Sequence, residues 1–318
     1  MARAVLAGPA FREDVLAGLA APIRAIPACW LYDRRGSELF EQITRLPEYY
    51  LTRVDTALLE AHCPEVAAIV GQGNAVIELG AGSAAKTPIL LRSIRPSAYV
   101  PIDISGDFLR ESAEALAAEF PDLPVHPVEA DFMARIPLPA AVAGDAKLGF
   151  FPGSTIGNMI PKTAVDLLRA MKDALGVGAY LLIGIDRAKD VATLLRAYDD
   201  SAGVTARFNL NLIHRINAEL GGTIPVEAFR HRALWNEPMS RIEMHLEAVR
   251  DVAFTVEGLD FAVRAGETIH TENSHKYGAR DGRLLLRAAG WTPVKEWTDG
   301  DEQFALILAE AEPPRFAP

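Results

Sequence analysis

The chain has 318 residues, of which half are hydrophobic and 23% are charged. This composition is typical of a globular protein with one large core or two domains. Its formal net charge of -10 argues against nucleic acid or an anionic membrane as the main partner. The two cysteines, Cys29 and Cys63, lack metal-ligand spacing, and neither a signal peptide nor a bilayer-spanning apolar run is evident. We therefore expect a cytoplasmic protein with reduced thiols, and a monomer, because no exposed apolar stripe can be identified.

Residues 1 to about 65 have a helical pattern with irregular joints. Ser37–Ile43 is amphipathic, with Ser37 as a candidate N-cap. A proline then interrupts the pattern and is followed by Tyr49 and Tyr50. Adjacent residues cannot share one helical face, so the sequence is equally compatible with one tyrosine in the core and the other facing a pocket, and with two half-buried packing tyrosines.

A glycine turn lies between a strand and a helix near residue 80. Val76–Leu79 is a short apolar strand, and Thr87-Pro88 suits the first turn of a helix. Between them, Gly80 and Gly82 permit backbone angles closed to other residues and the close approach of a ligand. Such a corner is typical of nucleotide-binding sites.

Three interpretations of this turn are possible. Gly80-x-Gly82-x-x-Ala85 fits a dinucleotide fingerprint, which would indicate a nicotinamide-dependent oxidoreductase. Read from Glu78, the acidic-x-Gly-x-Gly pattern fits the first motif of S-adenosylmethionine-dependent methyltransferases. A plain glycine-rich turn is the third, which the periodicity of both flanks disfavours.

The next segments continue the alternation of strand and helix. Residues 98–102 form a strand ending at Asp103, about twenty residues after the glycine turn, as expected of an acidic group that binds ribose hydroxyls. A helix over 105–120 and a strand over 125–129 follow. Asp131 can then accept a hydrogen bond from an adenine amino group, and Phe132 can stack on the ring.

A second glycine-rich loop, 152–158, follows the fourth strand, 147–151. It lies at a carboxyl end of a strand, where α/β sheets bind ligands. A helix over 161–175 and a strand over 179–185 come next.

Between about 190 and 285 the alternation stops. Helices are predicted over 191–200 and 208–220, and the alternating residues 241–249 predict an antiparallel strand. Two shorter strands, 254–256 and 261–263, are expected in the same sheet.

The C-terminal part returns to the first pattern, with a helix over 281–289 and strands over 291–298 and 303–308. The short turn between the last two strands predicts a hairpin, so that one strand is antiparallel to the rest. This ending favours the methyltransferase interpretation, because a dinucleotide dehydrogenase would need a second set of βαβ units.

Several uncommon strings occur in one order along the chain. They are Glu-Leu-Gly-Ala-Gly (78–82), Lys86-Thr87, Tyr-Val-Pro-Ile-Asp-Ile-Ser (99–105), Phe-Pro-Gly-Ser-Thr-Ile-Gly-Asn (151–158), Ala-Tyr-Asp-Asp (197–200), Gly-Val-Thr-Ala-x-Phe-Asn (203–209), Arg-Ile-Glu-Met-His-Leu (241–246) and Thr-Glu-x-Ser-x-Lys-Tyr (271–277). From about Tyr32 to Phe304 the chain resembles the histidine-specific Nα-methyltransferases of ergothioneine biosynthesis.

The resemblance implies an α/β fold, a seven-stranded class I methyltransferase (Rossmann-like) sheet with an inserted α+β substrate-binding domain. We expect residues 66–189 plus 281–312 to form the S-adenosylmethionine-binding methyltransferase domain, and 1–65 plus 190–280 the substrate-binding domain. The implied reaction is three methyl transfers from S-adenosylmethionine to the α-amine of L-histidine, giving hercynine.

The resemblance also implies the residues of both binding sites. The methyl donor would be held by Gly80, Lys86, Asp103, Asp131 and Phe132. A lysine such as Lys86 can meet the carboxylate of the donor as a point charge.

For the amino acid, the implied catalytic residues are Asn158 and Tyr198, which would bind the substrate α-carboxylate and orient the amine. Glu272 and Ser274 would contact the imidazole, because a carboxylate accepts from a ring N–H and a hydroxyl donates or accepts. The remaining substrate-binding positions are Tyr32, Tyr49 and Met244.

We expect no essential metal, because His231, His245, His270 and His275 do not form a recognisable ligand set. His270 and His275 are predicted to be surface or packing residues. Two other functions remain open: methylation of another amino acid, such as an indole-bearing one, and nicotinamide-dependent oxidoreduction. Glu272 disfavours an indole, because a buried carboxylate would pair with its single N–H and crowd the larger ring.

Overall fold

The computed structural model describes residues 8–133 and 136–313, and the chain divides into two compact units. The first unit comprises the residues up to Tyr49 together with Asp190–Ser274. The second unit comprises Tyr50–Lys189 and the chain from His275 onward. Each unit has its own sheet, and the two are described separately below.

The second unit is built on a mostly parallel sheet, which within the described residues has seven strands in the order β11-β12-β5-β4-β1-β2-β3. Only β12 runs antiparallel to its neighbours β11 and β5. The predicted α/β sheet and its closing hairpin are confirmed. The strands are β1 (Ala75–Leu79), β2 (Tyr99–Asp103), β3 (Val128–Glu129), β4 (Lys147–Phe151), β5 (Tyr180–Asp186), β11 (Trp291–Thr298) and β12 (Phe304–Ala311).

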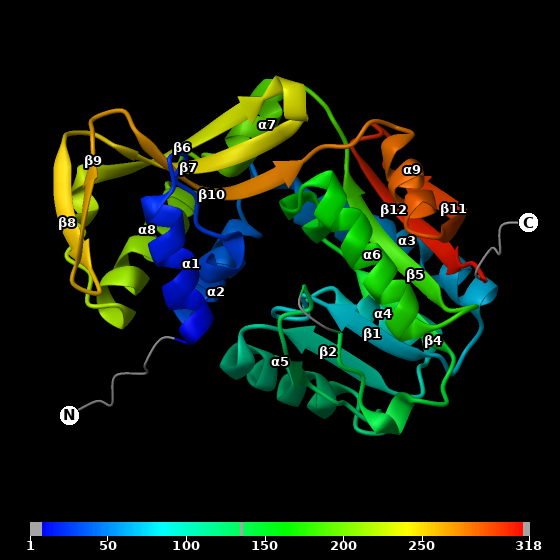
Figure 1. The fold of residues 1–318 in the computed structure, drawn as a ribbon. Coiled ribbons are helices and arrows are strands. Elements are labelled where there is room, and N and C mark those ends of the chain that lie inside the picture. The colour runs from blue at the N-terminus through cyan, green and yellow to red at the C-terminus, as the bar shows by residue number, and fades with distance from the viewer. Residues whose placement is uncertain (1–7, 134–135, 314–318) are drawn as a thin grey trace, which may run out of the picture. The chain divides into compact units, whose positions relative to one another are not determined.

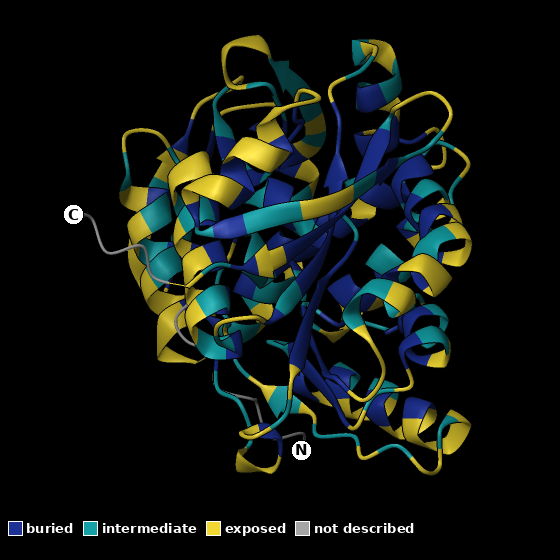
Figure 2. Ribbon diagram, turned by 90° about the vertical axis from the view of Figure 1, so that its right-hand side faces the viewer, coloured by how far each residue is buried: buried dark blue, intermediate teal, exposed yellow. Residues whose placement is uncertain are grey.

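Helices cover both faces of this sheet (Figure 1). One face packs against α6 (Pro161–Leu175) and α9 (Asp281–Ala288). The other packs against α3 (Tyr50–Val70), α4 (Thr87–Ile94) and the end of α5 (Gly106–Glu119). Figure 2 shows the central strands of this sheet in the dark blue of buried residues, with exposed residues on the outer faces of the helices. Burial on both faces explains why β1 is apolar except for Glu78.

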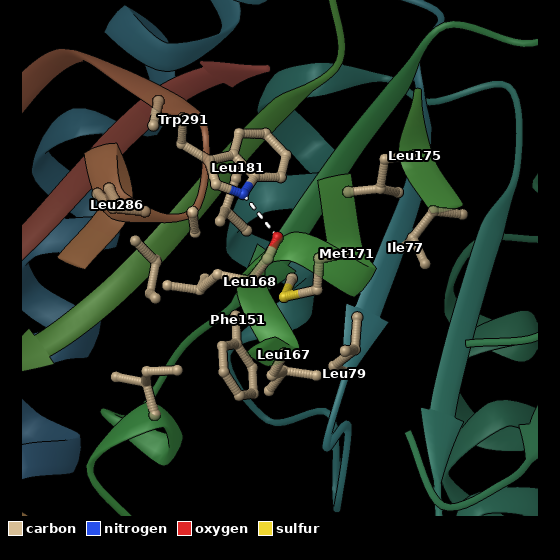
Figure 3. Close-up of a cluster of buried hydrophobic side chains, with 14 of the residues drawn as sticks. Ile77, Leu79, Phe151, Leu167, Leu168, Met171, Leu175, Leu181, Leu286 and Trp291 are labelled. Carbon is tan, nitrogen blue, oxygen red and sulfur yellow. Dashed lines mark hydrogen bonds between the residues drawn. The ribbon is translucent and has the colours of Figure 1, made fainter. Parts of the chain in front are cut away.

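The core on the α6 side is closely filled with aliphatic and aromatic side chains (Figure 3). Trp291 is fully buried there, and its indole Nε1–H donates to the carbonyl of Leu168 at 2.8 Å. This bond joins the first residue of β11 to the middle of α6. Burial of an indole without a partner would be costly, so the hydrogen bond allows the ring to fill the core.

The first unit has a sheet of three strands in the order β10-β7-β6, and α8 (Val204–Glu219) packs on β6 and β7. Its strands are β6 (Phe229–Asn236), β7 (Arg241–Ala248) and β10 (Thr268–His275), whose last residue belongs to the second unit. The other helices are α1 (Pro9–Ala20), α2 (Arg34–Ile43) and α7 (Val191–Tyr198).

Three expectations for the first unit are corrected. The strands β8 (Val252–Val256) and β9 (Leu259–Val263) do not join β7 but form a two-stranded sheet of their own. The strands β6 and β10 were not predicted, because their polar residues give no regular apolar alternation. The N-cap of α2 is Asp33 rather than Ser37, since Asp33 Oδ1 accepts from the backbone N–H of Gly36 at 2.7 Å.

The division into units differs from the expected domain boundaries, because residues 50–65 belong to α3, which packs on α4, β12 and β11 of the second unit. Cys63 is buried in this packed face, and burial raises its pKa to about 12. Across the described part of the chain, no helix has the length and apolarity to cross a membrane.

Candidate functional site

The turn after β1 is bound to the end of the neighbouring strand β2. Gly80 and Gly82 have φ of +67° and +52°, in the left-handed region where glycine is favoured. The backbone N–H of Gly82 donates to Asp103 Oδ2 at 3.0 Å, and the N–H of Ser105 donates to Oδ1 at 2.9 Å. Each carboxylate oxygen keeps a further lone pair that can accept from a ribose hydroxyl.

Gly80 lies at van der Waals distance from two side chains of its own unit. A Cβ placed on Gly80 would be 3.8 Å from the ring of Phe132 and 3.8 Å from the methyl group of Thr155, with no closer atom. Phe132 is half-buried and packs edge-on against Phe151, with ring centroids 6.1 Å apart. Asp131 is exposed, and its Oδ1 accepts from the N–H of Met133 at 2.9 Å. Two predicted donor residues, Asp103 and Phe132, thus lie against the glycine turn.

Lys86 forms an ion pair that the sequence analysis did not predict. Its Nζ lies 2.5 Å from Oδ2 of Asp55, a residue of α3 that is fully buried. The same Oδ2 accepts from the backbone N–H of Gly153 at 2.8 Å. Asp55 therefore connects α3, the turn after β1 and the loop after β4. No motif marks Asp55, and a polar residue within the helical pattern of 50–70 was the only available signal.

Glu78, the acidic residue of the first motif, is buried at the end of β1. Its Oε2 accepts from the hydroxyl of Tyr99 at 2.6 Å and from that of Thr87 at 2.7 Å. Burial raises the pKa of Glu78 to about 7, against the opposing effect of both hydrogen bonds. The carboxyl group thereby connects β1, β2 and the first residue of α4.

The second glycine-rich loop is fixed by the end of β5. The backbone N–H of Asp186 donates to Ser154 Oγ at 2.9 Å, and Ser154 has a φ of +58°. Its predicted site residue, Asn158, ends a short 3-10 helix, Thr155–Asn158, and belongs to the second unit.

A buried ionic cluster surrounds the Asp186 carboxylate. It contacts Lys189, while Tyr50 donates its hydroxyl to Oδ2 at 2.7 Å and the Lys276 ammonium lies 2.7 Å from the same oxygen. Burial lowers the pKa of Lys189 to about 8. Tyr50 therefore takes part in the polar core of the second unit.

In the first unit, two predicted substrate residues are in direct contact. The Tyr198 hydroxyl, at the end of α7, lies 2.6 Å from Ser274 Oγ on β10, and both side chains are buried. The ring of Tyr49 packs edge-on against that of Tyr198, with centroids 6.2 Å apart. Tyr49 and Tyr50 are therefore both buried, Tyr49 beside other predicted substrate residues and Tyr50 in the ionic cluster of the second unit.

Tyr32 belongs to the same aromatic group. Its ring lies 5.5 Å from that of Phe40 and 5.3 Å from that of Phe208, measured between centroids. Phe40 in turn packs edge-on against Tyr49. Packing of this kind fixes the orientation of the tyrosine rings.

A hydrogen-bonded network supports the backbone of Tyr198. Its carbonyl accepts from His231 Nε2–H at 2.8 Å, and His231 Nδ1 accepts from the amide of Asn209 at 3.0 Å. These two bonds define a neutral imidazole with the proton on Nε2. Burial lowers the pKa of His231, which favours the same neutral form.

Asn209 connects this imidazole to two strands of the sheet. It is fully buried on α8, and its amide also donates to the carbonyl of His245 at 3.0 Å. Its Oδ1 accepts from the hydroxyl of Thr271 at 2.7 Å, and that hydroxyl lies 3.0 Å from the carbonyl of Met244. Asn209, the last residue of the motif at 203–209, thus holds α8 to β7 and β10 at positions next to predicted substrate residues.

Met244 and Glu272, the other predicted substrate residues, are buried on β7 and β10, with exposed fractions of 1% and 8%. Glu272 and Ser274 are two residues apart on one strand, so their side chains leave the same face of the sheet. His270 donates from Nε2 to the carbonyl of Glu272 at 3.0 Å.

Glu243, His245 and His270 offer ligand atoms within 4.8 Å of one another. His270 is half-buried and packs on His245, and His275 is buried, so both are packing residues, one of the two predicted possibilities. The imidazoles of His245 and His270 are stacked, with centroids 4.7 Å apart and planes 14° apart. Because ring lone pairs lie in the plane of each ring, nearly parallel stacked rings do not direct them at one cation.

The predicted roles are divided between the two units. The residues predicted to bind the methyl donor belong to the second unit, and so does Asn158, a predicted substrate residue. The remaining substrate residues belong to the first: Tyr32, Tyr49, Tyr198, Met244, Glu272 and Ser274.

The chain is similar to known proteins along nearly its whole length. Residues 11–311 match the family model described as histidine-specific methyltransferase, SAM-dependent. The chain is 40% identical to the histidine N-alpha-methyltransferase of Mycolicibacterium smegmatis, over 95% of each chain. It is also 40% identical to the histidine N-alpha-methyltransferase of Mycobacterium tuberculosis, over 94% of each chain. A Neurospora crassa protein, ergothioneine biosynthesis protein 1, is 31% identical over 91% of this chain and 33% of its own length.

Proposed function

We propose that this chain converts L-histidine to hercynine by three methyl transfers to the α-amine. The chain belongs to the family of histidine-specific, S-adenosylmethionine-dependent methyltransferases, and this membership is the basis of the proposal. This reaction would be the first step of ergothioneine biosynthesis. The observation that carries the proposal is the identity of 40% to a histidine N-alpha-methyltransferase over 95% of both chains.

For the methyl donor, S-adenosylmethionine, the second unit supplies the binding groups. When bound, the donor provides an electrophilic methyl group on a sulfonium. In our proposal, Asp103 accepts hydrogen bonds from the ribose hydroxyls. Phe132 contacts the adenine ring, and Asp131 accepts a hydrogen bond from the adenine amino group. Gly80 allows the close approach, and Lys86 pairs with the carboxylate of the donor.

For histidine, the first unit supplies a contact for each end of the substrate. Tyr198, together with Asn158 of the second unit, would bind the α-carboxylate and hold the amine in place. Glu272 would accept from an imidazole N–H, and Ser274 would contact the same ring. The ring of Tyr49 and the side chain of Met244 would limit the space around the imidazole. Anchors at both ends matter because the amine loses a hydrogen-bond donor with each methyl group it gains.

Catalysis in this proposal depends on positioning. An in-line displacement needs a neutral amine aligned with the methyl carbon, and alignment alone can supply much of the rate enhancement. The α-amine has to lose a proton before each of the three transfers, and we propose that no metal is required for this step. We further propose that the enzyme is a cytoplasmic monomer.

The test is mass spectrometry of the products after incubation with S-adenosylmethionine and each proteinogenic amino acid in turn. The expected result is a gain of three methyl groups on histidine alone. Methylation of another amino acid would leave the family assignment intact but overturn the roles of Glu272 and Ser274. A product that stops at one methyl would contradict trimethylation, and no product with any amino acid would contradict the proposed substrate class.

A further inference from the structure

The geometry points to Asp55 as a positioning residue of the donor site, which sets the location of the Lys86 ammonium without itself touching the donor. This inference rests on the proposed role of Lys86 toward the carboxylate of S-adenosylmethionine. Asp55 lies on α3, thirty-one positions before Lys86, outside every motif of the sequence. None of the roles proposed above involves it.

The burial of the two side chains distinguishes their roles. The side chain of Asp55 is fully buried, whereas that of Lys86 keeps an exposed fraction of 19%. A ligand in the glycine turn can therefore reach Lys86 and not Asp55. An ammonium has three N–H donors, so the bond to Asp55 at 2.5 Å leaves two for a ligand carboxylate.

Asp55 also holds the backbone next to the ammonium. Its Oδ2 accepts from the N–H of Gly153 at 2.8 Å, and Gly153 has a φ of +76°. A Cβ on Gly153 would lie 3.2 Å from Lys86 Nζ, so the lysine lies directly against this turn. One carboxylate oxygen thus orients both the cation and the loop beside it.

The charges of the two side chains explain why Asp55 holds Lys86 in place. A buried carboxylate is costly unless an opposite charge and hydrogen bonds compensate for it. The other oxygen of Asp55, Oδ1, is buried and has no hydrogen-bond partner among the described residues, so compensation depends on the contacts of Oδ2. Lys86 is therefore held at one place before any ligand binds, which reduces the entropy lost on binding.

The experiment compares two ligands that differ at the amino-acid end. S-adenosylhomocysteine carries the α-carboxylate, and 5′-methylthioadenosine carries the same nucleoside without it. Both are titrated by calorimetry into the wild-type protein and into Asp55→Asn, which keeps the shape of the side chain and removes its charge. The inference predicts a roughly ten-fold loss of affinity for S-adenosylhomocysteine and a change of less than about two-fold for 5′-methylthioadenosine.

A matched control is Glu65→Gln. Glu65 is on the same helix and also pairs with a lysine, Lys295, at 2.9 Å, but it has no place in the proposed donor site. This variant should bind both ligands as the wild type does. A double variant, Asp55→Asn with Lys86→Met, should bind S-adenosylhomocysteine no more weakly than Lys86→Met alone.

Three outcomes would overturn the inference. Equal losses for both ligands in Asp55→Asn would show that Asp55 has only a structural role, and unchanged affinity for both would show that it does not position Lys86. Additive losses in the double variant would also contradict action through Lys86. Failure of the wild type to bind S-adenosylhomocysteine would instead contradict the proposed donor site, so the two failures are distinguishable.

Discussion

The hydroxyl of Tyr198 and the Oγ of Ser274 lie 2.6 Å apart, although 76 positions separate the two residues in the chain. Both side chains are buried, and the contact connects the end of α7 to β10. It places a group proposed for the substrate carboxylate against a group proposed for the imidazole. One short hydrogen bond thus links the contacts for both ends of histidine.

Replacement of Tyr198 by phenylalanine should impair histidine binding more than stability. The variant loses one hydroxyl, so the free energy of unfolding should fall by about 1 kcal/mol. The KM for histidine should rise at least roughly ten-fold, because the carboxylate loses a hydrogen-bond donor. Steady-state kinetics with varied histidine measures this. Tyr180→Phe, on β5 of the second unit, is the control and should leave KM unchanged; an unchanged KM in Tyr198→Phe would remove Tyr198 from the site.

Asn209→Ala should show that the network behind Tyr198 serves the substrate site. The variant leaves His231 and Thr271 without the amide partner, at a cost of about 2–3 kcal/mol in the free energy of unfolding, and should raise the KM for histidine. Urea denaturation and kinetics measure the two effects.

The matched control for Asn209 is Asn217→Ala on the same helix. The Asn217 amide makes two hydrogen bonds with the backbone of Ile224, a residue without a predicted role. This variant should lose stability but keep the wild-type KM. If both variants changed KM equally, the effect of Asn209 would be one of general stability.

Smaller apolar residues at Glu272 and Met244 should shift specificity from histidine toward tryptophan. Glu272→Ala removes the acceptor for the imidazole N–H, and Met244→Ala creates space in a buried wall. The ratio of kcat/KM for histidine to that for tryptophan should fall by at least roughly a hundred-fold in the double variant. Competition between the two amino acids in one reaction gives this ratio directly. An unchanged ratio would refute the specificity roles of both residues.

Glu78 should make the protein less stable as pH rises toward neutrality. Its pKa is about 7 in the folded protein, against an ordinary glutamate value of 4.5 when the chain is unfolded, so the folded protein binds the extra proton between these values. The stabilisation is complete below about pH 4.5 and is lost as pH rises through about 7, by about 3 kcal/mol in total.

The measurement for Glu78 is urea denaturation of the wild type and of Glu78→Gln at pH 5 and pH 8. The glutamine cannot ionise, so the difference in unfolding free energy between the two proteins should favour the wild type more at pH 5 than at pH 8. Subtracting the unfolding free energies of the two proteins cancels the contributions of the other titrating groups. One such group is Glu243, whose hydrogen bonds to Arg241, Asn236 and His245 lower its pKa to about 2 against the opposing effect of burial. An equal difference at both pH values would contradict a raised pKa.

The sequence by itself determined the sheet of the second unit and the motifs at its edge. The strand over 76–79 and the helix over 161–175 have strong apolar patterns, because parallel strands are buried on both faces and a covering helix on one. The hairpin at the end of the chain was predictable from two apolar runs around a short polar turn. The motif strings likewise identified the family without any knowledge of the fold.

Only the tertiary structure decided the groups that support these motifs. The ion pair of Asp55 with Lys86, the imidazole of His231 behind Tyr198 and the polar strand β10 depend on contacts between segments far apart in the chain. No local periodicity encodes such contacts, because a buried polar side chain is stable only where another segment supplies its partner. The placement of Tyr49 and Tyr50 has the same origin: the sequence left their environments open, and the packing of each ring decided them.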